Sequence, residues 1–175
     1  FTASVRSDSS GPSVITPAYT YTYADLDRAS DALCAKIRSI IDKKTMINIY
    51  QGRGFHFIVS MIAVVKARCG YIPVDASLPV ARARQMLSES PAVLTLCDTS
   101  TAPVANLGKV SALQVEAEVS SPADCINRPE FARSEQDELY NIFTSGSTGT
   151  PKASSVFYSG FWNLLEWYSE TLGVT

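Results

Sequence analysis

The sequence has one histidine, four cysteines and no long hydrophobic run, and these shortages exclude several kinds of protein. The cysteines stand at positions 34, 69, 97 and 125, so no Cys-x-x-Cys pair is present for a zinc knuckle or a thioredoxin-type redox site. We expect them to be buried free thiols in a reducing cytosol. The longest apolar stretch, 57–65, is far shorter than the ~18–20 residues that span a bilayer.

Neither sign of charge dominates, because 15 Lys and Arg face 17 Asp and Glu and the net charge is -2. Without a basic excess we expect no nucleic-acid partner. The first eleven residues are polar and do not form a signal peptide, and no Asn-x-Ser/Thr sequon occurs. We therefore expect a cytoplasmic protein with no membrane partner, although a segment upstream of Phe1 could carry a targeting signal.

Apolar residues, in contrast, are plentiful enough for a folded domain. They make up 46% of the 175 residues, and charged residues make up 18%. A chain of this length buries roughly 70% of the surface that its unfolded form exposes. Intrinsic disorder is therefore not expected, and the length suits about one domain.

Strand-like and helix-like segments alternate along the chain. The periodicities predict strands at 19–23, 46–50, 71–74, 92–96, 109–115, 139–143 and 156–158, and helices at 24–42, 55–66, 77–90 and 160–172. The regions 98–108 and 116–136 are predicted to be connections. Because Pro73 cannot donate to a strand ladder, we expect its strand to lie at an edge or to end there. The alternation predicts an α/β fold, with helices layered around a largely parallel sheet.

Several polar residues could suggest catalysis, but their context favours structural roles. Thr22 and Asp25 have the spacing of a helix capping box. Asp27 and Asp31 are expected on the solvent face of the first long helix. His56, which any Ser-His-Asp triad would need, lies in an apolar helix and is interpreted as a core or helix-face residue.

The last helix carries more aromatic residues than one buried stripe requires. The stripe is formed by Phe161, Leu164, Leu165, Tyr168 and Leu172. Trp162 and Trp167 lie off the stripe, and we interpret the aromatic group as packing surface rather than as a base-stacking platform. We also expect the native polypeptide to continue beyond Thr175 and to cover this surface.

The sharpest chemical signal is a loop of small and hydroxylated residues that follows the 139–143 strand. Gly146 and Gly149 would let backbone N–H groups point into one concavity, which makes an anion nest. Lys152 adds a positive charge, and the hydroxyl donors are Thr144, Ser145, Ser147, Thr148 and Thr150. The loop therefore suits a polyphosphate. The alternative is a flexible Ser/Thr/Gly linker, which the preceding strand and the stiff Pro151 disfavour.

Two well-known phosphate motifs are absent. A P-loop needs glycines five positions apart with a lysine directly after the second, whereas Gly146 and Gly149 are three apart and Lys152 follows a proline. The dinucleotide fingerprint fails as well, because Phe57 stands where a third glycine should follow Gly52 and Gly54.

Segment 143–152, Phe-Thr-Ser-Gly-Ser-Thr-Gly-Thr-Pro-Lys, resembles the phosphate loop of the adenylate-forming enzymes. This acyl-activating superfamily includes acyl-CoA synthetases, firefly luciferase and the adenylation domains of nonribosomal peptide synthetases. Segments 21–26 and 65–75 resemble the Leu-Thr-Tyr-x-Glu-Leu and Leu-Lys-Ala-Gly-x-Ala-Tyr-x-Pro-x-Asp blocks of those adenylation domains, and 163–168 resembles the helix after the loop. We assign the two earlier blocks core and turn roles.

The chain departs from the family pattern at a few positions. Ala153 stands where the family usually has glycine, and Tyr158 where a histidine is common. Arg68 and Cys69 replace the usual glycine and a small residue. The Tyr158 difference puts in doubt any role for a histidine at that point.

The resemblance implies a fold and a domain organisation. Residues 1–175 would be the front part of the large N-terminal domain of an adenylation domain, an α/β fold of layered sheets with flanking helices. The remainder of the large domain, and the small C-terminal domain with its catalytic lysine, would lie outside this chain.

The resemblance also implies an activity. Such enzymes bind Mg-ATP and an amino or other carboxylic acid, form an acyl-adenylate, release pyrophosphate, and load a carrier-protein phosphopantetheine thiol. A small accessory protein of the MbtH-like type is a further implied partner. The implied phosphate-binding residues are Thr144, Ser145, Gly146, Ser147, Thr148, Gly149, Thr150 and Lys152, with Thr148 and Lys152 as the catalytic ones. No metal ligand is assigned, because the Mg²⁺ ligands and the acyl pocket are expected outside the 175 residues, which alone should be inactive.

Two alternatives stay open. One is an acyl- or aryl-CoA ligase of the same superfamily, which a downstream pocket without an aspartate for an α-amino group would indicate. The other is a non-catalytic, adenylation-like interaction module, which would lack ATP-dependent activity even in its complete form.

Overall fold

Helices and strands alternate along the chain, as the sequence predicts. The structure, a computed structural model, describes residues 2–119, 134–145 and 151–172. The helices are α1 (Thr2–Ser7), α2 (Tyr23–Ile40), α3 (Phe55–Lys66), α4 (Val80–Glu89), α5 (Ala102–Ala105), α6 (Val115–Val119) and α7 (Tyr158–Leu172). The strands are β1 (Pro12–Ile15), β2 (Thr20–Thr22), β3 (Met46–Gln51), β4 (Gly70–Asp75), β5 (Leu94–Cys97), β6 (Ser111–Gln114), β7 (Glu138–Ser145) and β8 (Pro151–Phe157).

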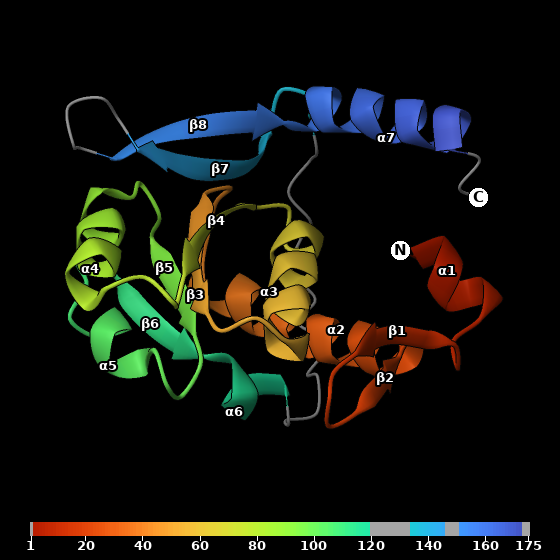
Figure 1. Ribbon diagram of the computed structural model, residues 1–175, viewed down its shortest axis with the longest axis horizontal. Helices are drawn as coiled ribbons and strands as arrows, with labels where there is room; N and C mark the ends of the chain where they lie inside the picture. Colours follow the sequence, from red (N-terminus) through yellow and green to blue (C-terminus); the bar gives the residue numbers. More distant parts are fainter. Residues whose placement is uncertain (1, 120–133, 146–150, 173–175) are drawn as a thin grey trace.

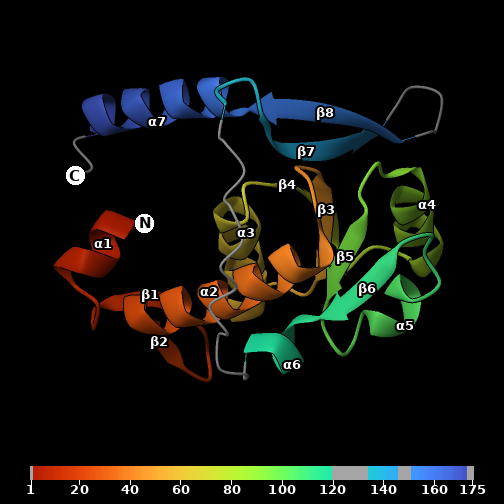
Figure 2. The same ribbon diagram turned by 180° about the vertical axis from the view of Figure 1, so that it is seen from behind.

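A six-stranded sheet in the order β6-β5-β3-β4-β7-β8 organises the molecule (Figure 1). Strands β6, β5, β3, β4 and β7 run parallel to one another, and β8 is antiparallel to β7. Helices α2 and α3 cover one face, while α4 and α5 cover the other (Figures 1 and 2). The predicted α/β class and the largely parallel sheet are confirmed.

The α2–α3 face holds the larger apolar core. Leu26, Leu33 and Ile37 recur at helical spacing on α2 and are at most 3% exposed. They pack with Val59 and Val64 of α3, which are fully buried. Burying side chains of this size stabilises the fold by about 1.5–3 kcal/mol each. The periodicity that predicted the helices is therefore the pattern that builds this core.

The capping box at the start of α2 is present as predicted. The Thr22 hydroxyl accepts a hydrogen bond from the Asp25 N–H (3.1 Å), and the Asp25 carboxylate accepts one from the Thr22 N–H (3.0 Å). Hydrogen bonds from the Thr22 backbone and side chain hold the pKa of Asp25 below its ordinary value. Two otherwise unpaired N–H groups at the helix start are thereby satisfied.

The predicted edge position of the Pro73 strand is wrong. β4 lies between β3 and β7, and it continues two residues beyond Pro73 to Asp75. Proline is tolerated there because the register with β7 contains a single pair, Tyr71 opposite Tyr140, in the described part of the chain. The missing N–H therefore falls beyond the shared ladder.

Two predicted connections contain short helices. Region 98–108 includes α5, and the region predicted as a connection from 116 onward begins inside α6. The described part of the second connection ends at Val119 and resumes at Ser134. Neither helix exceeds five residues, which is too short for a clear periodic signal.

Helix α3 ends in a Schellman motif in which a non-glycine residue takes the left-handed conformation. Arg68 has φ 62°, the position that glycine usually fills. The Cys69 N–H donates to the Val64 carbonyl (3.0 Å), and the Arg68 N–H donates to the Val65 carbonyl (3.1 Å). A glycine, which the family usually has at this position, would adopt the left-handed conformation without strain.

Three cysteines are buried free thiols, as expected. These are Cys34, Cys69 and Cys97, and burial raises the pKa of Cys34 and of Cys97 to about 11. Thiols of this kind are poor nucleophiles at neutral pH. The fourth, Cys125, lies outside the described residues.

Candidate functional site

The β7–β8 hairpin carries both ends of the predicted phosphate loop. Thr144 and Ser145 are the last residues of β7, and Pro151 and Lys152 are the first of β8. Thr144 is paired with Lys152, and Ser145 with Pro151. The predicted loop of 144–152 is thus too long, because antiparallel pairing continues into it from both sides.

The described structure reaches only part of the predicted site. Thr144 is exposed at the end of its strand, and the backbone of Lys152 lies directly across from it. The predicted residues Gly146, Ser147, Thr148, Gly149 and Thr150 lie outside the described residues. Their role as phosphate ligands stays a prediction.

The hairpin joins the sheet through an aromatic contact. The Tyr140 ring lies 5.6 Å from the Tyr71 ring of β4 and 6.3 Å from the Phe161 ring of α7, between centroids. Burial raises the pKa of Tyr71 to about 12. Because β7 is parallel to β4, its carboxyl end lies at the edge where β3, β4 and β5 also end. Ligands of open α/β sheets bind outside that edge.

The carboxylates at this edge already accept hydrogen bonds from groups in the neighbouring loops. Asp98 accepts hydrogen bonds from the Gly52 N–H (2.7 Å) and the Ser100 hydroxyl (2.6 Å), and Asp75 accepts one from the Ser77 N–H (2.8 Å). Burial acts to raise the pKa of Asp98, but hydrogen bonds from Ser100 and Gly52, among others, hold it below its ordinary value. Among the described residues, no three His, Cys, Asp or Glu side chains come together as a metal site.

A polar cluster in the hairpin was missed by the sequence analysis. Glu138 accepts hydrogen bonds from the Ser155 hydroxyl (2.7 Å) and from the Asn141 amide nitrogen (3.4 Å). The cluster depends on a register shift between Glu138 and Tyr140, which no local periodicity reveals. A polar residue in the middle of an apolar strand, Asn141, was the available signal.

The other carboxylates considered as a cluster have a structural partner. Lys66 of α3 contacts Asp27 (2.6 Å) and Asp31 (2.7 Å) of α2. The prediction of a purely solvated face was therefore incomplete, because these two carboxylates bridge to a neighbouring helix. His56 is half-buried on α3 with its ring 5.7 Å from that of Phe55, as expected for a helix-face residue.

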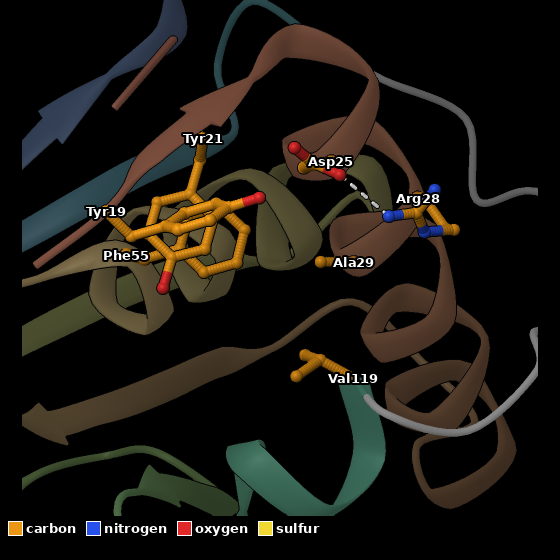
Figure 3. A pocket seen from close by; sticks show the side chains of 7 residues that line it. All are labelled: Tyr19, Tyr21, Asp25, Arg28, Ala29, Phe55 and Val119. Atoms are coloured by element: carbon orange, nitrogen blue, oxygen red, sulfur yellow. Dashed lines mark hydrogen bonds and ion pairs between the residues drawn. The ribbon is translucent and has the colours of Figure 1, made fainter. Parts of the chain in front are cut away.

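A hollow of about 330 Å³ is lined by residues of β2, α2, α3 and α6 and by Tyr19 (Figure 3). One wall is aromatic: the Tyr21 ring stacks on Phe55 at 3.7 Å, and Tyr19 meets Tyr21 edge-on. Across it, Arg28 pairs with Asp25 (2.8 Å) on α2. The stacking agrees with the packing role assigned to the 21–26 block, and these residues take no part in the hairpin.

The family model of the AMP-binding enzymes matches residues 1–169. D-alanine--D-alanyl carrier protein ligase of Lactiplantibacillus plantarum is 30% identical over 151 residues, which are 85% of this chain and 29% of that protein. Tyrocidine synthase 3 of Brevibacillus parabrevis is 32% identical over 164 residues, which are 93% of this chain and 2% of that protein. The chain therefore spans less than a third of either relative.

Solved structures agree in fold. A crystal structure of the nonribosomal peptide synthetase FmoA3 matches with a TM-score of 0.86 at 20% identity, covering 99% of this chain and 18% of that one. The o-succinylbenzoate coenzyme A synthetase of Bacillus subtilis, in complex with AMP, matches with a TM-score of 0.82 at 17% identity, covering 99% and 46%.

No helix among the described residues combines the length and the apolar character that crossing a membrane requires. The match over 1–169 includes the hairpin and nearly all of α7, and the fold is that of the N-terminal domain of adenylate-forming enzymes. The chain belongs to the AMP-binding family of adenylate-forming enzymes.

Proposed function

We propose that this chain is the N-terminal part of an adenylation domain that activates an amino or other carboxylic acid with ATP. The observation that carries the proposal is the pairing of Thr144 with Lys152 at the carboxyl end of β7. This pairing places Thr144, a hydroxyl donor, and the backbone of Lys152 at the two ends of segment 145–151, which consists of Gly, Ser and Thr residues and Pro151. Such an arrangement suits the binding of phosphate groups.

The composition of segment 144–152 suits a polyphosphate. The segment 144–152 supplies five hydroxyls and one lysine and contains no carboxylate that would repel phosphate. Backbone N–H groups and Lys152 would bind the β- and γ-phosphates of ATP and stabilise charge on the departing pyrophosphate. A form of FmoA3 with AMPPNP bound is among the matching structures, with a TM-score of 0.81.

The proposed reaction is an adenylyl transfer. A carboxylate oxygen of the substrate bonds to the α-phosphorus of ATP, and the bond from that phosphorus to the bridging oxygen breaks. The products are an acyl-adenylate and pyrophosphate, which carries away the bonding electrons. Thr148 and Lys152 are the residues of this chain that we expect to lower the barrier, and we assign no Mg²⁺ ligand to it.

The acceptor of the acyl group is proposed to be the phosphopantetheine thiol of a carrier protein. The support comes from the two relatives, one a D-alanyl carrier protein ligase and the other tyrocidine synthase 3. An accessory protein of the MbtH-like type is a further proposed partner. A CoA ligase is the second candidate, supported by the shared fold of the coenzyme A synthetase, and a comparison of coenzyme A with carrier protein as the acceptor separates the two.

The test is ATP–pyrophosphate exchange by the complete enzyme that contains this chain. Lys152→Ala and Thr148→Ala should each weaken exchange by roughly 10–1000-fold, the range for losing a donor to developing charge. Lys43→Ala, which removes an exposed lysine in the connection between α2 and β3, is the matched control and should leave exchange unchanged. Wild-type rates in both loop variants would refute the phosphate assignment.

A further inference from the structure

We infer that Glu138 is a positioning residue for the phosphate-binding end of the hairpin. It ties β8 to β7 at the base of the hairpin and fixes the register that sets Thr144 opposite Lys152. The inference rests on the proposed function of that end, because a ligand must be present for its position to matter.

The contacts of Glu138 span both strands. One carboxylate oxygen accepts from the Ser155 hydroxyl of β8 at 2.7 Å, and the other accepts from the Asn141 amide of β7 at 3.4 Å. Hydrogen bonds to an ionised acceptor are stronger than those between neutral groups. The short Ser155 contact is therefore the main link across the strands.

A β-bulge makes this cluster possible. Residues three apart on a regular strand point to opposite faces, so Glu138 and Asn141 would normally be separated. Here the register runs from Glu138 opposite Phe157 to Tyr140 opposite Val156, which leaves one extra residue in β7. Asn141 is then opposite Ser155, on the face that Phe157 also shares. The bulge turns Glu138 toward the other two polar groups, because the extra residue changes the direction of the side chains next to it.

The hairpin needs such a link because few backbone pairs join it to the rest of the sheet. β7 is paired with β4 at Tyr71 and Tyr140 only, within the described residues, and β8 is an edge strand. Thr144 lies three residues beyond Asn141, about 10 Å along the strand. A one-residue slip of β8 would turn all its side chains to the opposite face and replace Lys152 as the partner of Thr144.

Asn141 gives the Glu138 side chain a second contact. Its side chain is 4% exposed, and its amide oxygen has no hydrogen-bond partner among the described residues. A buried amide of this kind is unfavourable unless its remaining contact is kept. Because Glu138 and Asn141 both belong to β7, this contact holds the Glu138 side chain on its own strand, where its other oxygen accepts from Ser155 of β8.

The test compares Glu138→Ala, Glu138→Gln and Ser155→Ala in the complete enzyme, with Glu135→Ala as control. Glu135 is an exposed carboxylate three residues earlier, outside the strand. We expect Glu138→Ala to weaken ATP binding roughly 10-fold, since small displacements at a binding site cost this much or more. The KM for the carboxylic acid should stay within about twofold, because the variant displaces only the phosphate-binding end.

The variants of the pair separate positioning from general stability. Glu138→Gln keeps an acceptor for Ser155 and should retain ATP affinity within about threefold. The double variant of Glu138→Ala and Ser155→Ala should be no worse than Glu138→Ala alone, because Glu138→Ala already removes the contact that Ser155→Ala would remove. Equal loss in Glu138→Gln and Glu138→Ala, or an unchanged ATP affinity in Glu138→Ala, would overturn the inference.

Amide hydrogen exchange measures the hairpin directly. Glu138→Ala should speed exchange at 142–144 and 152–154 but not in α2 or α3, whereas Glu135→Ala should change neither. Faster exchange with an unchanged affinity for ATP would show that Glu138 only stabilises the hairpin, and it would overturn the positioning role. ATP affinity is measured by calorimetry without a carboxylic acid, so an enzyme that binds ATP but forms no adenylate refutes the proposed function alone.

Discussion

The α2–α3 layer and α7 are both apolar, yet they lie in opposite environments. Leu33, Val59 and Val64 of the layer are fully buried, whereas no residue of α7 is buried in the part that the structure describes. On α7, Trp162 is 62% exposed and Leu172 is 60% exposed. Figure 1 shows the reason: α7 extends beyond the sheet, past the end of the hairpin.

The comparison shows that an apolar sequence favours burial of a helix but does not determine which part of the protein covers it. Helix α3 connects two parallel strands, β3 and β4, so the crossover places it on the sheet. Helix α7 follows an edge strand, and its described contacts include the Tyr140 ring that meets Phe161. The expected stripe of Phe161, Leu164, Leu165, Tyr168 and Leu172 is present, and most of it is exposed. An apolar surface of this kind usually marks a contact site.

The largest expected effect is the difference in unfolding free energy between two leucine-to-alanine variants, one in each region. Leu33→Ala should lower the free energy of unfolding by about 2–5 kcal/mol, because it leaves a cavity in a closed core. Leu164→Ala, at a side chain 46% exposed, should cost less than about 0.5 kcal/mol in the 175-residue chain. Urea unfolding followed by circular dichroism measures both. Equal losses would contradict the comparison, and a larger loss for Leu164→Ala in a longer polypeptide would show that something covers α7.

Stability should be nearly as sensitive to a substitution where β4, which follows α3, approaches the hairpin that leads to α7. Gly70 begins β4, and a Cβ there would meet the Glu138 carbonyl at 2.6 Å and the Met46 sulfur at 2.5 Å. The methionine can move, but the backbone carbonyl of β7 cannot move without shifting the hairpin. Gly70→Ala should therefore destabilise the chain by about 1–3 kcal/mol. Gly54→Ala is the control for added bulk, since no atom lies within 4 Å of a Cβ there, and equal stability of Gly70→Ala and wild type would refute the close approach.

The smallest effect has the opposite sign. Arg68 takes a left-handed conformation at the end of α3, so Arg68→Gly should stabilise the chain by about 1 kcal/mol. Arg84→Gly, at an exposed position inside α4, should destabilise it by about 1 kcal/mol. Thermal unfolding of the two variants gives the comparison. Destabilisation by both would show that the left-handed turn carries no strain.

Much of the fold was predictable from local patterns. The bounds of α3 match the predicted 55–66, and the Thr22–Asp25 spacing predicted the cap that begins α2. The sequence predicted Thr144 and Lys152 as the ends of a phosphate loop, and the structure pairs these two residues; it did not predict how far the strands extend around them. These features depend on residues close together in the chain, whose periodicity and spacing the sequence shows directly.

The remaining features depend on partners that are distant in the sequence. The edge position expected for Pro73 was wrong because strand order is set by pairing with β7, some seventy residues later. Lys66 meets Asp27 and Asp31 only when α3 packs on α2. The sequence by itself predicted the longer helices and most strands of the central sheet, because hydrophobic period is local, and it supplied the hypothesis that one loop binds phosphate. The tertiary structure alone decided the strand order, the cluster around Glu138 and the exposure of α7, because a side chain's burial and hydrogen bonds depend on which distant segment packs against it.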